Sequence, residues 1–262
     1  MPVDSCSYET VVDGLRRLGV ARGAVVEVHG SLKAFGRVEG GAPTVLKALM
    51  DVVSSEGTIV MSAYLVSLAV PLTDDDRAHG LTWKVRKLPV DSTEPTGMGL
   101  IADTFRARLD VVCGNDLHRT CAWGHDAEWH CCGYHGLLAV DGWCLLLGVG
   151  IDRCSSMHAG EYVPLPPEIA SCWTIPPEVE RAYDPEMWDI GYGGPPDDAW
   201  EKVWALADER GLIEHGLVCG AMSHYFRARS VVSIYKHWRM TDPHGLYGVP
   251  RPGKVSAAGT DR

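Results

Sequence analysis

Hydrophobic spacing in the N-terminal part of the chain changes from a helical period to that of a strand and back. In residues 8–18 the apolar side chains recur on one helical face, which predicts a helix capped by Ser7 and ended by Gly19. A strand is predicted next at residues 24–30, followed by a helix at 43–53 with Pro43 in its first turn. A buried strand is predicted at 57–64.

The rest of the chain continues this alternation. Helices are predicted at 98–108, 197–211 and 221–239, and a strand covered on both faces at 144–150. A polar stretch at about 70–97 is typical of an active-site loop, and a Pro-rich segment at 164–177 leads to a possible hairpin. Alternating strands and helices predict an α/β fold, a sandwich with a mostly parallel or mixed central sheet.

Length and composition fit a folded enzyme-sized domain. The chain has 262 residues, 46% of them hydrophobic, and no apolar run approaches the ~20 residues that span a bilayer. We expect a single domain over residues 1–248 and a loose tail over 249–262. The N-terminus has no apolar signal region, so we expect a cytoplasmic protein whose nine cysteines are reduced.

The net charge of −10 bears on the partners. Nucleic-acid binding needs a basic face, so we expect no such partner, and we expect no membrane partner either. An acidic cleft would attract a cationic small molecule, although many cytoplasmic proteins are simply acidic.

The stretch GVGIDRCSSMHAGE, residues 148–161, is the strongest candidate for chemistry. It lacks the third glycine of a dinucleotide fingerprint and the G-x-S-x-G of a nucleophile elbow. What remains is a strand, a tight turn and a helix with Ser155 or Ser156 as N-cap. His158 then lies in the first turn with Glu161 on the same face, and a helix N-terminus disfavours imidazolium, so His158 is a candidate base. The alternative is a histidine that merely caps or packs.

Other patterns leave further hypotheses open. The HCCGYH segment at 130–135, with His125 nearby, has residue types that bind zinc, but adjacent cysteines rarely face one ion. Cys154 is conceivable as a nucleophile. The glycine-rich stretch at 28–43 allows close backbone approach to a phosphate or pantetheine.

Several of these stretches together resemble one family. VHGSLKAFGRVEGGA, HRTCAWG and LLLGVGIDRCSSMHAGE are similar to the signature blocks of the aminoglycoside 3-N-acetyltransferases, the antibiotic N-acetyltransferases. MGLIADTFRAR and AMSHYFRARSVV resemble two further blocks, so that the likeness covers about residues 8–240 in the right order. Departures are Gly30 for a serine, Arg119 for a small polar residue and Cys219 for a glycine.

The resemblance implies an α/β/α sandwich with a central mixed sheet, distinct from the common GNAT fold. It implies acetyl-CoA as cosubstrate and the 3-amino group of a 2-deoxystreptamine aminoglycoside as acceptor, hence antibiotic resistance, in a monomer or homodimer. By position, the catalytic residues would be His158 as base, Glu161, Asp189 as a possible orienting acid, and Ser155 near the thioester. The coenzyme would be bound by Ser155 and by a turn made of Ser31, Leu32, Phe35, Gly36, Gly40 and Gly41.

The acceptor site is expected to draw on the regions that match the family least, insertions at about 65–97 and 162–200. Its candidates are His118, Glu161 and the acidic run Asp74, Asp75 and Asp76, with no metal. We expect direct transfer, with Ser155 and the backbone N–H groups of 155–158 stabilising the thioester oxygen. Rival hypotheses are the same chemistry on another amine, biosynthetic or antibiotic, and a zinc-stabilised binding protein without turnover.

Overall fold

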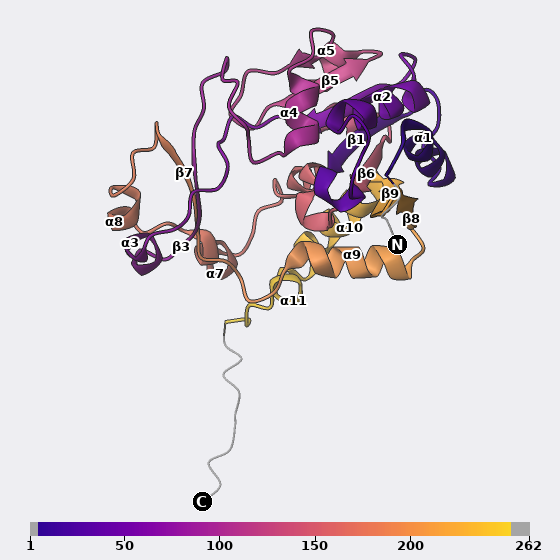
Figure 1. The fold of residues 1–262 in the computed structure, drawn as a ribbon. Helices are drawn as coiled ribbons and strands as arrows, with labels where there is room; N and C mark the ends of the chain where they lie inside the picture. Colours follow the sequence, from indigo (N-terminus) through magenta and orange to yellow (C-terminus); the bar gives the residue numbers. More distant parts are fainter. Residues whose placement is uncertain (1–4, 253–262) are drawn as a thin grey trace, which may run out of the picture.

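Seven strands form one mixed sheet, in the order β4-β5-β2-β1-β6-β9-β8, in a computed structural model that describes residues 5–252 (Figure 1). The central strands β2, β1 and β6 are parallel, and the outer pairings are antiparallel. This arrangement confirms the mixed sheet. The strands are β1 (Val25–Gly30), β2 (Thr58–Ser62), β4 (Val112–Cys113), β5 (Thr120–Gly124), β6 (Trp143–Leu147), β8 (Ile213–Val218) and β9 (Ala221–Arg227).

Helices cover both faces of this sheet. One face carries α1 (Tyr8–Arg17), α2 (Ala42–Val53) and α4 (Leu100–Arg106), and the opposite face carries α9 (Ala199–Glu209) and α10 (Ala228–Thr241) (Figure 1). Short helices near the main sheet include α5 (Ala127–His130), α6 (His135–Ala139), α11 (Pro243–Tyr247), η1 (Leu32–Phe35), η2 (Ile151–Arg153) and η3 (Ser155–Gly160). In residues 5–252 no helix has the length and apolar character needed to cross a bilayer.

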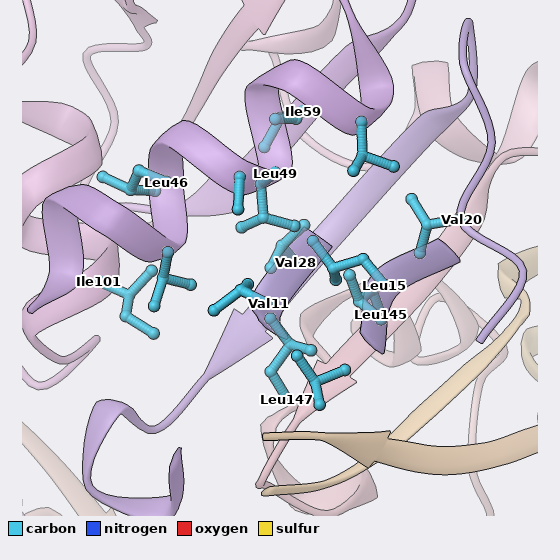
Figure 2. Packing of buried hydrophobic residues seen from close by; sticks show 14 of the residues in the cluster. Val11, Leu15, Val20, Val28, Leu46, Leu49, Ile59, Ile101, Leu145 and Leu147 are labelled. Atoms are coloured by element: carbon cyan, nitrogen blue, oxygen red, sulfur yellow. The ribbon is translucent and has the colours of Figure 1, made fainter. Parts of the chain in front are cut away.

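Side-chain alternation along the strands divides the core in two. Val28, Leu145 and Leu147 point towards α1 and α2, where they join the cluster drawn in Figure 2. Cys144 and Leu146, which alternate with Leu145 and Leu147 along β6, face the layer of α9 and α10 instead. Both faces of the central strands are therefore buried, which is the physical reason for their nearly continuous apolar runs.

Most predicted elements are confirmed at their predicted places, with two corrections. The helix expected at 221–239 is a strand, β9, followed by α10, because Ala221–Arg227 alternates in burial and pairs with β6 and β8. The hairpin expected after 164–177 is wrong, because that segment forms α7 (Pro167–Ala170), η4 (Ser171–Trp173) and the start of α8 (Pro177–Glu180).

The two regions expected as insertions pair with each other. β3 (Leu81–Arg86) from the first and β7 (Trp188–Tyr192) from the second form a separate antiparallel sheet, with α3 (Asp74–Ala78) beside it. We call this unit the β3–β7 subdomain. Figure 1 shows it extending from the main sheet. The expected tail at 249–262 lies mostly outside the described residues.

The expectation that all cysteines are reduced is wrong at four positions. Cys6 is bonded to Cys219 across a sequence separation of 213 residues, and Cys113 is bonded to Cys121. The second pair stands directly opposite in the β4–β5 ladder. Spacing along the chain indicates neither pair, since the fold alone brings these sulfurs together.

Candidate active site

A cavity of about 610 Å³ opens beyond the carboxyl ends of the parallel strands, the edge at which α/β sheets bind ligands. Its walls come from the segments that follow β2 and β6 and from the two loops around β5. The lining residues are Tyr64, His118, Cys132, Gly133, Tyr134, His135, Ser155, His158, Ala159, Glu161 and Tyr162. Four residues proposed from the sequence, His118, Ser155, His158 and Glu161, are therefore brought to one cavity.

His158 and Glu161 form a direct pair in this cavity. His158 Nδ1 lies 2.9 Å from Glu161 Oε2, and each side chain is about half exposed. The Trp200 ring meets the imidazole edge-on, with centroids 4.9 Å apart. Within residues 5–252, no hydrogen bond or ion pair involves His158 Nε2. The carboxylate therefore fixes one nitrogen and leaves the other available to a ligand.

The segment that carries His158 differs from the predicted helix head. Residues Ser155–Gly160 form a 3₁₀ helix, whose N-cap is Cys154 and which no side chain caps. The first amides of this segment are already engaged: Ser156 N–H donates to Glu27 Oε1 at 2.9 Å, and Ser155 N lies 3.3 Å from His29 Nε2. The expectation that these amides stabilise a thioester oxygen is therefore not supported.

Hydroxyl groups lie where the amides were expected to act. Ser62 Oγ donates to Ser155 Oγ at 2.8 Å and lies 2.5 Å from the hydroxyl of Tyr134. Burial raises the pKa of Tyr64 and raises that of Tyr134 well above its ordinary value, so both phenols stay protonated and can donate. Neither tyrosine was proposed from the sequence, because no local pattern distinguishes them from core aromatics.

Asp189 contacts a different histidine from the one expected. Its Oδ2 lies 3.7 Å from His118 Nε2, whereas the acid beside His158 is Glu161. The strand β7 carries Asp189 on the β3–β7 subdomain, so this contact connects that unit to the cavity. His118 also packs edge-on against Tyr64, at 4.9 Å between ring centroids.

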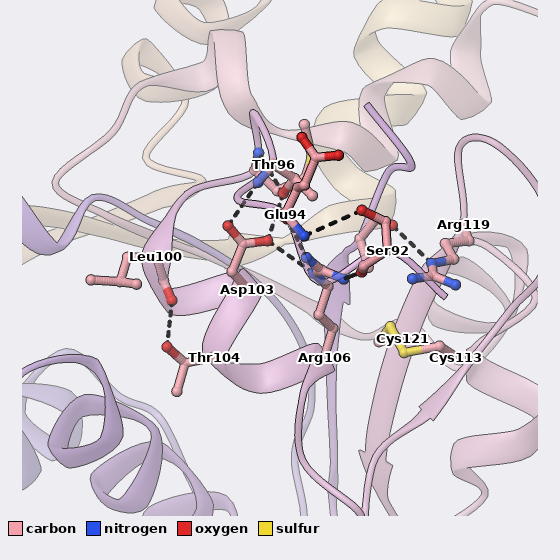
Figure 3. A network of polar contacts seen from close by, with 12 residues as sticks. Ser92, Glu94, Thr96, Leu100, Asp103, Thr104, Arg106, Cys113, Arg119 and Cys121 are labelled. Carbon is pink, nitrogen blue, oxygen red and sulfur yellow. Dashed lines mark hydrogen bonds and ion pairs between the residues drawn. A yellow bond between two sulfur atoms is a disulfide. The ribbon is translucent and has the colours of Figure 1, made fainter. Parts of the chain in front are cut away.

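Arg119 anchors the loop that carries His118. Its guanidinium donates to the carbonyl oxygens of Ala63 at 3.1 Å and Val90 at 3.2 Å, next to the polar network around Asp103 and Arg106 (Figure 3). These bonds tie the exit of β2 to the loop before α4. This departure from the family's small polar residue therefore has a structural role.

The glycine-rich turn lies at the carboxyl end of β1, beside the end of β6. Ser31 N–H donates to the Leu147 carbonyl at 3.0 Å, and Gly36, Gly40 and Gly41 have φ values of 79°, 75° and 65°. Phe35 is buried in the core, so its ring is not available to a ligand. None of the residues from Ser31 to Gly41 lines the cavity itself.

The acidic run lies away from the cavity in which it was expected, and the rival hypothesis of a zinc site in the Cys/His segment gains no support. Asp74, Asp75 and Asp76 lie on α3 and line no part of the cavity. Among the described residues, the three-donor group close enough to hold one ion is Glu27, Cys144 and Cys154, which includes none of the 125–135 segment.

Comparison with known proteins identifies the family. The model of the aminoglycoside 3-N-acetyltransferase family matches residues 28–240. Aminoglycoside N(3)-acetyltransferase III of Serratia marcescens is 28% identical over 87% of this chain and 95% of its own length. The YokD protein of Bacillus subtilis, described as aminoglycoside N(3')-acetyltransferase-like, is 32% identical over 59% of this chain and 64% of its own. The chain belongs to the aminoglycoside 3-N-acetyltransferase family.

Solved structures agree with this fold. Aminoglycoside acetyltransferase AAC(3)-IVa superimposes with a TM-score of 0.69 at 21% identity, covering 94% of this chain and 93% of that one. The complex of AAC-IIIb with CoASH gives 0.65 at 20% identity, covering 94% and 99%. The alignment to the first curated relative spans just under two thirds of that relative's length, at 64%.

Proposed function

We propose that this protein transfers the acetyl group of acetyl-CoA to the 3-amino group of a 2-deoxystreptamine aminoglycoside, and that this reaction confers resistance. The observation that carries the proposal is the His158–Glu161 pair, with a free imidazole nitrogen in a cavity of about 610 Å³. Family membership supports the reaction class. Related structures contain CoASH in one case and gentamicin or apramycin in others, which supports the two substrates.

We propose direct transfer, without an acyl-enzyme. The Nδ1–H of His158 donates a hydrogen bond to Glu161 Oε2, which leaves the Nε2 lone pair to take a proton from the acceptor's ammonium group and release it to solvent. The freed amine forms a C–N bond to the acetyl carbon while Nε2 takes the second amine proton and the C–S bond breaks. The Nε2 proton then passes to the departing sulfur, which restores the neutral imidazole. The Ser155 hydroxyl is the group best placed to donate to the acetyl oxygen while that oxygen bears charge.

A second candidate is the same chemistry on a less charged amine. Among the residues that line the cavity, Glu161 is the sole carboxylate, beside three tyrosines and three histidines. A polycationic antibiotic favours several carboxylates, whereas a monoamine on a ring needs few. This composition supports an acceptor other than an antibiotic of the family's usual kind.

The test is release of the CoA thiol from acetyl-CoA with 4,5-disubstituted, 4,6-disubstituted and apramycin-like aminoglycosides, and with a cyclic monoamine. Turnover with an aminoglycoside, acetylated at N3 by NMR, supports the first candidate. Turnover with the monoamine alone supports the second. Failure to bind acetyl-CoA would overturn both.

The base is tested by replacing His158. His158→Ala should lower kcat about 10²- to 10⁴-fold, the usual value of general-base help, while the affinity for acetyl-CoA stays within about twofold. His237→Ala, at an exposed position on α10, is the matched control and should be unchanged. A wild-type kcat in His158→Ala would show that the base is another group.

A further inference from the structure

A carboxylate is buried beneath the segment that carries Ser155. Glu27 lies in the middle of β1, the central strand of the sheet, and has no exposed surface. Its Oε1 lies 2.6 Å from His29 Nε2 and accepts the Ser156 N–H at 2.9 Å. Its Oε2 has no hydrogen-bond partner in the part of the chain that the structure describes.

Packing alone does not account for this residue. Burying a charged group carries a desolvation penalty, and replacing a whole buried ion pair by apolar side chains of similar volume is often neutral or stabilising. The strand neighbours Val26 and Val28 are apolar and face the opposite layer. What Glu27 provides beyond volume is a hydrogen-bond acceptor aimed at the start of the 3₁₀ helix.

The same carboxylate reaches Ser155 through His29. The imidazole nitrogen that contacts Glu27 also lies 3.3 Å from Ser155 N, but one ring nitrogen bonds only one of these two groups at a time, so the Ser156 N–H bond to Glu27 is the firm attachment of the 154–156 turn. On the other side of the turn, Ser62 holds the Ser155 hydroxyl. Ser155 is thereby fixed through its side chain and through the backbone of the next residue.

We propose that Glu27 and His29 are positioning residues that hold the 154–156 turn so that the Ser155 hydroxyl faces the acetyl oxygen. This inference rests on the proposed function, and it adds two residues to which no role was assigned. Because the amides of Ser155 and Ser156 contact the pair, oxygen stabilisation depends on hydroxyl groups, and their placement becomes critical.

The first test separates positioning from stability. Glu27→Met, assayed well below its melting temperature, should lower kcat about 10²-fold, the scale of a misplacement of about 1 Å, with KM for acetyl-CoA nearly unchanged. Its melting temperature should also fall, because His29 loses its buried partner. Glu27→Gln retains an amide oxygen for Ser156 N–H and should restore much of the loss. Glu214→Gln changes an exposed carboxylate on β8, so it is the control and should leave kcat unchanged. A kcat that returns to the wild-type value at lower assay temperatures, where Glu27→Met is fully folded, would indicate a structural role only.

A double-mutant cycle identifies the residue through which Glu27 acts. If the effect passes through Ser155, adding Glu27→Met to Ser155→Ala should lower kcat no further, because the hydroxyl being positioned is absent. Independent losses that multiply would overturn the proposal.

A third measurement needs no substrate. Amide hydrogen exchange in residues 154–158 should be at least about tenfold faster in Glu27→Met than in wild type, while α10 keeps its protection. Unchanged exchange would overturn the positioning role whichever acceptor is used. If residues 154–158 exchange slowly in wild type and faster in Glu27→Met, but no amine is acetylated, the proposed function fails and the positioning of the turn by Glu27 stands.

Discussion

Asp76 is the residue for which the sequence and the structure make opposite predictions. Placed in the acceptor site by its acidic run, it is instead almost fully buried, at 3% exposure, in the β3–β7 subdomain. Both carboxylate oxygens lie 2.7 Å from Lys84 Nζ, and Oδ1 accepts the Tyr183 hydroxyl at 2.7 Å. With Thr73 it completes a capping box at the start of α3. Asp76→Asn should therefore destabilise this unit.

The size of the effect follows from what the substitution leaves behind. The Lys84 ammonium is about nine-tenths buried and would lose the carboxylate with which it forms its ion pair. Removing one member of a buried pair costs about 3–5 kcal/mol. Asparagine preserves part of the capping geometry, so we expect the lower end, about 3 kcal/mol. For a domain of this size that corresponds to a fall of about 6–12 °C in melting temperature.

The pH dependence has a definite sign. Lys84 and the Thr73 backbone hold the pKa of Asp76 well below its usual range. A carboxyl with a depressed pKa contributes stability that is present above its unfolded pKa, about 3.9, and is lost as pH falls through the folded value. The stability difference between wild type and Asp76→Asn should therefore be full at pH 7 and shrink below about pH 4.

Urea unfolding followed by circular dichroism, at pH 7 and at pH 3, measures both effects. Asp74→Asn is the matched control: its carboxylate is fully exposed, and the midpoint of unfolding should stay where it is in wild type. Acceptor KM, measured below the melting transition, separates the two roles. A raised KM with unchanged stability in Asp76→Asn would refute the structural argument and restore Asp76 to the acceptor site.

Two further changes test the packing around the site and the disulfide. Gly160→Ala places a Cβ in steric clash with the buried Tyr235 ring, so we expect the free energy of unfolding to fall by about 1–3 kcal/mol. Gly97→Ala, where the Cβ has room, is the control and should lose almost none. Equal melting temperatures of the two variants would contradict this packing. Cys6→Ser removes the link to Cys219, whose 213-residue separation gives a loss of at most about 5 kcal/mol under oxidising conditions. Reductant should then destabilise wild type far more than Cys6→Ser, and equal sensitivity would show that this disulfide does not form in solution.

Local periodicity was sufficient for most of the fold. The helix at 8–18 and the strand at 24–30 each lie in one segment whose apolar spacing is complete, and both are confirmed. The failure at 221–239 has a physical cause. Its first seven residues form a strand only because β6 and β8 lie on either side of them, and that pairing is invisible to a local period. The partnership of β3 and β7, about a hundred residues apart, was hidden for the same reason.

The site shows the same division between local and long-range information. His158 and Glu161 are three residues apart, so a short motif contains both, and the structure pairs them directly. Asp189 was proposed to orient His158 and meets His118 instead, because its position depends on β7 joining a distant strand. Tyr64 and Tyr134 line the cavity from separate segments, and no sequence motif indicates that either tyrosine has a role there.

One local signal in the sequence points to the buried carboxylate beneath the site. Residues 24–30 were interpreted as a strand, and a charged residue in the middle of a central strand conflicts with burial on both faces. Such conflicts between a residue and its environment are expected where function constrains the chain. Glu27 is such a residue. Its carboxylate connects β1 to the segment after β6, and these two strands become neighbours only in the folded sheet. The sequence alone indicates that Glu27 is unusual, and the pairing of β1 with β6 shows that its carboxylate binds the Ser156 N–H.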